Sequence, residues 1–117
     1  MFVAKDLSNN NKVAIKKIMH STEQEIKQNC TELFFLAKLQ HLNIVKLENA
    51  FVIPETRQMW IVMEYLVGIT LTQATKMEKF DEHQIAYISR ELLYALKFIH
   101  KLQICHHDVK GSNVKQL

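Results

Sequence analysis

Three polar residues stand close together near the end of the chain, in a segment otherwise rich in apolar residues. Asp108, Lys110 and Asn113 fall within six consecutive positions of the segment 104–114. They supply a carboxylate, an ammonium and a carboxamide, and packing alone explains such a group poorly because charged side chains are rarely buried without partners. Three such groups in one short segment indicate a polar loop rather than a packed element.

A lysine early in the chain lies on a predicted strand. Residues 12–18 alternate, so that Ala14, Lys16 and Ile18 share one face of this strand. From the strand alone, Lys16 is explained by a side chain that extends to water at a strand end. The alternative is a functional cation that sits beside two apolar neighbours.

A helix is predicted to follow this strand. Ser21 or Thr22 can cap it, with Gln24 or Glu25 as the capping-box partner three residues further on. Glu32 lies next to the apolar stripe of this helix, and a solvated glutamate is its ordinary interpretation. Helical spacing predicts a stripe made of Ile26, Cys30, Leu33 and Ala37.

The other predicted elements place these residues in a mixed architecture. Alternation and turn residues indicate strands over 2–7, 43–53 and 58–63, with turns at 8–11 and 54–57. The segment 64–68 ends in Gly68 and is a plausible hinge. From Leu71 the chain is predicted to be helical with one break, and Asp81 caps the longer helix with Gln84. Its apolar stripe, expected in the core, consists of Ile85, Ile88, Leu92, Ala95 and Ile99.

Length and composition restrict the class of protein. The 117 residues allow one compact unit, and 48% hydrophobic with 23% charged residues indicates a globular chain. No apolar run approaches the roughly 20 residues of a membrane helix, so we expect no membrane partner. A net charge of +3, evenly spread, does not favour nucleic acid. With no evident signal peptide, Cys30 and Cys105 are expected to be reduced thiols in a cytoplasmic protein.

Four features occur in an order that resembles a known family. Residues 13–16 read Val-Ala-Ile-Lys, Glu32 follows on a helix, and residues 63–66 read Met-Glu-Tyr-Leu after a strand. The series ends in His-x-Asp-x-Lys-x-x-Asn over residues 106–113. In this order, the chain resembles a eukaryotic protein kinase. Residues 41–45, 60–66 and 84–91 are similar to the STE group, in its PAK and germinal-centre branch.

The resemblance implies ATP and a magnesium ion as cofactors and a protein hydroxyl as the substrate. Asp108 would accept the proton of that hydroxyl, and Lys110 would steady the γ-phosphate. Asn113 would bind the magnesium ion. Lys16 would hold the α- and β-phosphates and pair with Glu32.

The resemblance also implies a site for the adenine ring. Ala14 would contact the ring, and Met63 would stand behind it as the gatekeeper. The backbones of Glu64 and Leu66 would form hydrogen bonds with its edge.

The chain departs from the family pattern at both ends. No Gly-rich loop precedes the strand at Phe2 and no Asp-Phe-Gly motif follows the loop, so we expect an incomplete domain with a half-built magnesium site. His107 stands where the family has an arginine, and a histidine is only partly charged near neutrality. Lys115 and Gln116 replace apolar strand residues, and we expect the exit from the loop to lack support.

We therefore expect an α+β, protein-kinase-like fold. It would consist of an antiparallel N-lobe sheet with its αC helix over residues 1–66, and the first helices of the C-lobe over residues 67–117. One hypothesis is a serine/threonine protein kinase that transfers the γ-phosphoryl group of ATP to protein hydroxyls, inactive or weak as this chain. The other is a non-catalytic module that binds a kinase or a regulator through an exposed apolar face.

Overall fold

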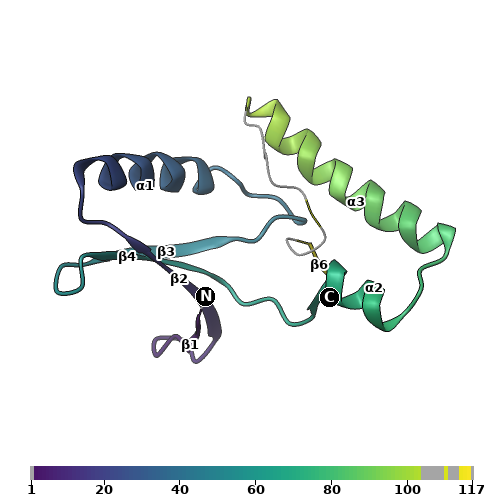
Figure 1. Ribbon diagram of the computed structural model, residues 1–117, viewed down its shortest axis with the longest axis horizontal. Coiled ribbons are helices and arrows are strands. Elements are labelled where there is room, and N and C mark those ends of the chain that lie inside the picture. The colour runs from purple at the N-terminus through teal and green to yellow at the C-terminus, as the bar shows by residue number, and fades with distance from the viewer. Residues whose placement is uncertain (1, 104–109, 111–113, 117) are drawn as a thin grey trace. The chain divides into compact units, whose positions relative to one another are not determined.

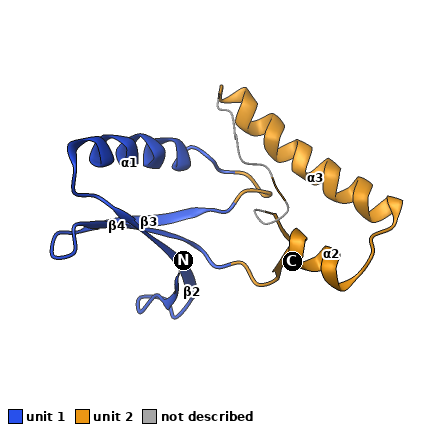
Figure 2. Ribbon diagram, in the orientation of Figure 1, with its two compact units in different colours: residues 1–40, 45–65 blue, residues 41–44, 66–117 orange. Residues whose placement is uncertain are grey.

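The structure is a computed structural model that describes residues 2–103, 110 and 114–116. It divides the chain into two compact units, shown in blue and orange in Figure 2. Unit 1 comprises Met1–Gln40 and Val45–Tyr65, and unit 2 comprises His41–Ile44 and Leu66–Leu117. The predicted division at residues 66 and 67 stays a prediction.

Unit 1 is built on a four-stranded sheet, as expected for the first half of the chain. The strands lie in the order β1-β2-β4-β3, and every neighbouring pair is antiparallel (Figure 1). The alternation of apolar and polar residues that predicted these strands is typical of a sheet with unlike faces. Their bounds are Phe2–Lys5 for β1, Lys12–Met19 for β2, Leu47–Ile53 for β3 and Gln58–Glu64 for β4.

The turn between β1 and β2 begins earlier than predicted and shortens the first strand. The Asp6 carboxylate accepts hydrogen bonds from the Ser8 hydroxyl at 2.6 Å and the Ser8 backbone N–H at 2.9 Å. These bonds, the hydroxyl bond first, lower the pKa of Asp6 below its ordinary 3.8. Asn10 has a φ of 61°, a left-handed conformation that Asn tolerates. The strand therefore ends at Lys5 because Asp6 already bonds to the turn.

The predicted strand over 43–53 was wrong at its start. The structure begins β3 at Leu47, and residues 42–44 form a turn and a bend. Within that turn the His41 ring accepts the Asn43 N–H at 3.0 Å, and the His41 carbonyl accepts the Ile44 N–H at 3.1 Å. These local bonds replace the ladder that an extended segment would form.

Helix α1, Glu23–Leu36, lies along one face of the sheet in unit 1 (Figure 1). Thr22 caps it and forms the predicted box with Glu25. The predicted apolar stripe was wrong in part, since Ile26, Cys30 and Ala37 are exposed and Leu33 is half-buried. The buried position on this helix is Asn29, one residue from the predicted Cys30, so the inward face is rotated from the predicted one.

Unit 2 contains two helices and a small two-stranded sheet. Asp81 caps the longer helix with Gln84, as predicted, and Thr70 caps the shorter one with Gln73, which was not predicted. The break expected in the helical region lies between them. The elements are β5 at Ile69–Thr70, α2 at Leu71–Met77, α3 at Glu82–Lys101 and β6 at Lys115–Gln116.

Residues 114–116 form backbone hydrogen bonds that their sequence did not suggest. Lys115 pairs with Thr70 and Gln116 with Ile69, so β6 adds to β5 as an antiparallel strand. The Leu71 N–H donates to the Val114 carbonyl at 2.6 Å. Backbone hydrogen bonds do not require apolar side chains, so the two polar residues join a strand despite their composition.

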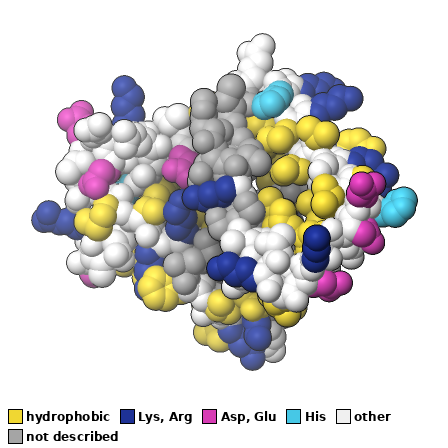
Figure 3. Space-filling model, turned by 45° about the vertical axis from the view of Figure 1, so that its right-hand side comes forward, with side chains coloured by type: hydrophobic (Ala, Val, Ile, Leu, Met, Phe, Trp, Pro, Cys, Tyr) yellow, Lys and Arg dark blue, Asp and Glu magenta, His cyan; other side chains and the backbone are white. Residues whose placement is uncertain are grey.

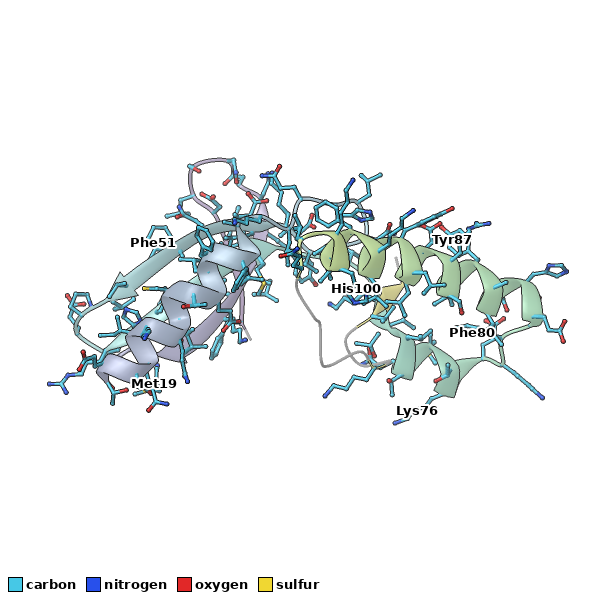
Figure 4. The ribbon with its side chains drawn as sticks, turned by 90° about the horizontal axis from the view of Figure 1, so that it is seen from above. Met19, Phe51, Lys76, Phe80, Tyr87 and His100 are labelled. Atoms are coloured by element: carbon cyan, nitrogen blue, oxygen red, sulfur yellow. The ribbon has the colours of Figure 1, made fainter. Side chains whose placement is uncertain are left out.

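The apolar stripe of α3 is buried at one end only. Ala95 and Ile99 are buried, whereas Ile85 at the start of the helix is 52% exposed. Tyr87 is also exposed, and Figure 4 shows it on the side of α3 that faces away from α2. Hydrophobic side chains gather on the face of unit 2 turned to the viewer in Figure 3. In the part of the chain described, no helix has the length and apolar character needed to cross a bilayer.

Candidate functional site

The structure brings together two predicted residues that lie far apart in the sequence. The Lys16 ammonium on β2 and the Glu32 carboxylate on α1 form an ion pair with an Nζ–Oε1 distance of 3.9 Å. This distance is close enough for charge attraction but longer than a hydrogen bond. The pairing expected of Lys16 and Glu32 is therefore present in unit 1.

The Lys16 face of the sheet also carries Ala14 and Met63, two of the four residues predicted at the adenine ring. Ala14 lies directly opposite Met63 in the β2–β4 register, and Lys16 lies opposite Ile61. Alternate residues on a strand share a face, so all four side chains project to one side of the sheet. Ala14 is buried and Met63 is half-buried, whereas Ile61 is almost completely enclosed, with 1% of its surface exposed.

This face has the chemistry to receive a nucleotide. Lys16 keeps 48% of its side chain exposed, and Glu32 keeps 50%, so the lysine is held by a partner and is still accessible to an anion. The neighbouring Ala14 has a small apolar side chain that is buried on the same face. A cation next to a small apolar position fits a molecule with a phosphate at one end and an aromatic base at the other.

The opposite face of the same strands has a different arrangement. Lys17 places its ammonium 4.3 Å from the ring centre of Phe2 and 4.3 Å from that of Trp60. Both contacts are of the cation–π type. Two consecutive lysines therefore have different partners, because successive side chains on a strand point to opposite faces.

The end of β4 is hydrogen-bonded to the residue that precedes β3. The Glu64 N–H donates to the Lys46 carbonyl at 3.0 Å, and the Glu64 carboxylate accepts the Lys46 N–H at 2.8 Å. In unit 2, the Leu66 carbonyl accepts a hydrogen bond from the Lys115 ammonium at 3.4 Å. Gly68 follows with a φ of 136°, in a region that favours glycine.

The predicted catalytic loop is described only in part. Asp108 and Asn113 lie outside the described residues, as does His107. Lys110 is described and exposed. Among residues 2–103, 110 and 114–116, no group of three His, Cys, Asp or Glu side chains could hold a metal ion. The magnesium site assigned to Asn113 therefore stays a prediction.

The sequence did not point to a polar contact that attaches the turn before β3 to helix α3 in unit 2. The Asn43 amide donates to the Glu91 carboxylate at 3.1 Å, and the His41 ring lies 5.1 Å from the Phe98 ring, centre to centre. Nothing local in the sequence marks this contact, because its partners are separated by nearly 50 positions. An open groove of about 420 Å³ lies beside these residues, between the turn and α3.

Comparison with known proteins places these features in a family. The protein kinase domain pattern matches residues 1–115. The chain is 40% identical over 114 residues to the probable serine/threonine-protein kinase mkcB of Dictyostelium discoideum. It is 37% identical over 117 residues to the serine/threonine-protein kinase pakC of the same organism. The serine/threonine-protein kinase max-2 of Caenorhabditis elegans is 32% identical over 114 residues.

These matches cover nearly all of this chain but a small part of each relative. Each alignment covers 97% of the chain, which corresponds to 16% of mkcB, 24% of pakC and 18% of max-2. The kinase-like α+β fold expected from the sequence is confirmed by the matched pattern together with the antiparallel sheet and helices. The chain belongs to the protein kinase domain family.

Proposed function

We propose that this chain supplies the nucleotide-binding part of a serine/threonine protein kinase. Such an enzyme transfers the γ-phosphoryl group of ATP to a protein hydroxyl, and ATP supplies the group that is moved. The observation that carries the proposal is the Lys16–Glu32 ion pair at 3.9 Å, on the sheet face where Ala14 stands opposite Met63. The serine/threonine kinases among its relatives support the same activity.

The residues of unit 1 would bind and orient the nucleotide. Glu32 lies beside Lys16 and would help to orient its ammonium toward the phosphates. Ala14 and Met63 would border the adenine ring. Asp108, Lys110 and Asn113 would accept the substrate proton, steady the γ-phosphate and hold magnesium, and these roles rest on the sequence pattern.

A nucleotide titration tests this proposal directly. A fluorescent ATP analogue is titrated into the chain, into Lys16→Met and into the control Lys17→Met. Both variants remove one positive charge from β2, but only Lys16 lies on the face with Ala14 and Glu32. We expect weaker binding for Lys16→Met and wild-type binding for Lys17→Met, with circular dichroism to verify folding. Equal binding by all three proteins would contradict the proposal.

Phosphoryl transfer to a generic basic protein tests the later step. Activity should fall in Lys16→Met and in Asp108→Asn. Activity that neither substitution changes would belong to a contaminating kinase, and the enzymatic proposal would then fail.

Two finer assignments also belong to the proposal. The STE group, in its PAK and germinal-centre branch, is supported by the sequence of residues 60–66 and by the similarity to pakC. A cytoplasmic location rests on the cysteine argument, and fluorescence microscopy of the tagged chain tests it. A nuclear or secreted distribution would contradict it.

A second candidate function is a non-catalytic module that binds a kinase or a regulator. The observation that favours it is the set of exposed apolar side chains on α3, which comprises Ile85, Tyr87, Leu93 and Tyr94. A folded chain that binds no nucleotide, but binds a purified kinase domain at micromolar concentration, would support this candidate. Nucleotide binding that depends on Lys16 would favour the first.

A further inference from the structure

One polar side chain is buried on the inner side of α1. Asn29 has 9% of its surface exposed and is the only buried polar or charged residue within the described part of the chain. A buried amide is costly unless its donors and acceptor are bonded. Its presence at a position where a helix would ordinarily place an apolar residue therefore requires an explanation.

Asn29 connects α1 to the end of β2. Its amide nitrogen donates to the Met19 carbonyl at 2.7 Å and lies 3.0 Å from Nδ1 of the His20 ring. The Met19 carbonyl can only accept, so the nitrogen rather than the oxygen of the amide must face it. Figure 4 shows Met19 beside the end of the unit where α1 begins. The contact is a hydrogen-bonded link between the helix and the strand.

The link lies close to the Lys16–Glu32 pair on both elements. Met19 comes three residues after Lys16 on β2, and Asn29 comes three residues before Glu32 on α1. Residues three apart on a helix are neighbours on its surface. A displacement of the helix at Asn29 therefore moves Glu32 as well.

Few other contacts hold this part of the helix. Leu33 and Leu36 are half-buried, while Ile26, Phe34 and Phe35 are exposed. With so little apolar burial, the rotation and height of α1 over the sheet depend on specific bonds. The capping box of Thr22 and Glu25 is local to the first turn, whereas the Asn29 amide bonds to β2.

We propose that Asn29 is a positioning residue that holds Glu32 against Lys16. Its amide anchors α1 to the Met19 carbonyl one helical turn before Glu32, and this fixes the face of the helix that meets the sheet. The importance of this role for phosphoryl transfer rests on the proposed kinase function. The positioning itself is a structural property and can be measured without activity.

A chemical cross-link measures the Lys16–Glu32 contact directly in the 117-residue chain. A carbodiimide activates the Glu32 carboxylate, and attack by the Lys16 amine forms an amide bond and releases the urea by-product. Mass spectrometry quantifies the fraction of the Lys16 peptide joined to the Glu32 peptide. Both side chains are about half exposed, so the reagent can reach them.

Two substitutions remove the link in different ways, and a neighbouring residue supplies the control. Asn29→Ala removes the amide, whereas Asn29→Asp keeps the size of the side chain and loses the donor. Gln28→Ala removes an exposed amide from the adjacent position of the same helix. Each protein is compared below its thermal transition, so that a lower overall stability alone does not change the yield.

We expect the cross-link yield to fall about fivefold in both Asn29 variants, the change expected for the loss of one net hydrogen bond. It should be unchanged in Gln28→Ala. Equal yields in all proteins would overturn the positioning role. A further variant, His20→Ala, separates the two contacts, since it removes the ring and retains the bond to the Met19 carbonyl. A yield in His20→Ala as low as in Asn29→Ala would overturn the assignment to the Met19 bond.

Titration of the fluorescent ATP analogue distinguishes this inference from the proposed function. If the wild-type chain binds no nucleotide but its cross-link depends on Asn29, the kinase proposal fails and the positioning role stands. If the chain binds nucleotide through Lys16 but the cross-link yield is the same in the wild type and the Asn29 variants, the positioning role fails and the kinase proposal stands.

Discussion

The Lys16–Glu32 pair should contribute little to the stability of unit 1, although it lies at the centre of the candidate site. Two opposite unit charges 3.9 Å apart attract by about 1 kcal/mol in the dielectric of water. The two side chains are 48% and 50% exposed, so the surrounding dielectric is close to that of water. Ordering two long side chains offsets part of the attraction, and we expect a coupling of about 0.5 kcal/mol.

A double-mutant cycle measures this coupling. The cycle uses Lys16→Met, Glu32→Gln and the double variant, each unfolded in urea. Trp60 is the single tryptophan of the chain and lies on β4, so its fluorescence follows the unfolding of unit 1. The matched cycle with Lys17→Met should give no coupling to Glu32, because Lys17 lies on the other face of the sheet.

Salt provides a second check on the same pair. Between about 0.01 M and about 1 M salt the screening length falls from about 30 Å to about 3 Å, so the coupling should largely disappear. A coupling above about 2 kcal/mol would refute the argument, because it would require a pair shielded from water. A coupling of zero at low salt would refute the ion pair itself.

Three further predictions concern the elements that carry the site. Ile61→Ala should lower the free energy of unfolding of unit 1 by about 2–5 kcal/mol, because it opens a cavity at an almost fully enclosed side chain. Urea unfolding measures this loss, and a value under about 1 kcal/mol would contradict the prediction. Asp81→Ala should destabilise α3 by about 1 kcal/mol, because it removes the cap of the helix. Amide hydrogen exchange in the first turn of α3 should become faster, and unchanged exchange would contradict the role of the cap. Low pH should destabilise the first turn of α1. Hydrogen bonds from Thr22 first and then Ser21 lower the pKa of Glu25 below its ordinary 4.5. That stabilisation is complete above pH 4.5 and lost as the pH falls through the lowered pKa. Circular dichroism should show a loss of helical signal over this pH range, and Glu25→Gln should reduce this pH dependence.

Local patterns were sufficient where neighbours in the sequence decide the structure. The cap at Asp81 was predicted, and Thr22 was one of two candidate caps for α1, because each bonds to a residue three positions away. The hairpin between β3 and β4 followed from alternation and from the turn residues between them.

Local patterns failed where a distant group or the backbone decided. The strand β6 formed from Lys115 and Gln116 because their backbone groups found partners on β5, which composition cannot indicate. The predicted start of β3 was wrong for a local reason that alternation does not show, because the Asn43 N–H bonds to the His41 ring within the same turn.

The sequence by itself determined the kinds of elements, their caps, and the order of the residues that mark the protein kinase family. These depend on residue type and on spacing within a few positions, which one chain displays without any tertiary contact. Only the tertiary structure decided that Asn29 rather than Cys30 faces inward, and that Lys16 and Glu32 meet at 3.9 Å. The physical reason is that helical periodicity gives the spacing of a buried face but not its absolute rotation. That rotation is set by the bond Asn29 makes to a carbonyl ten residues away.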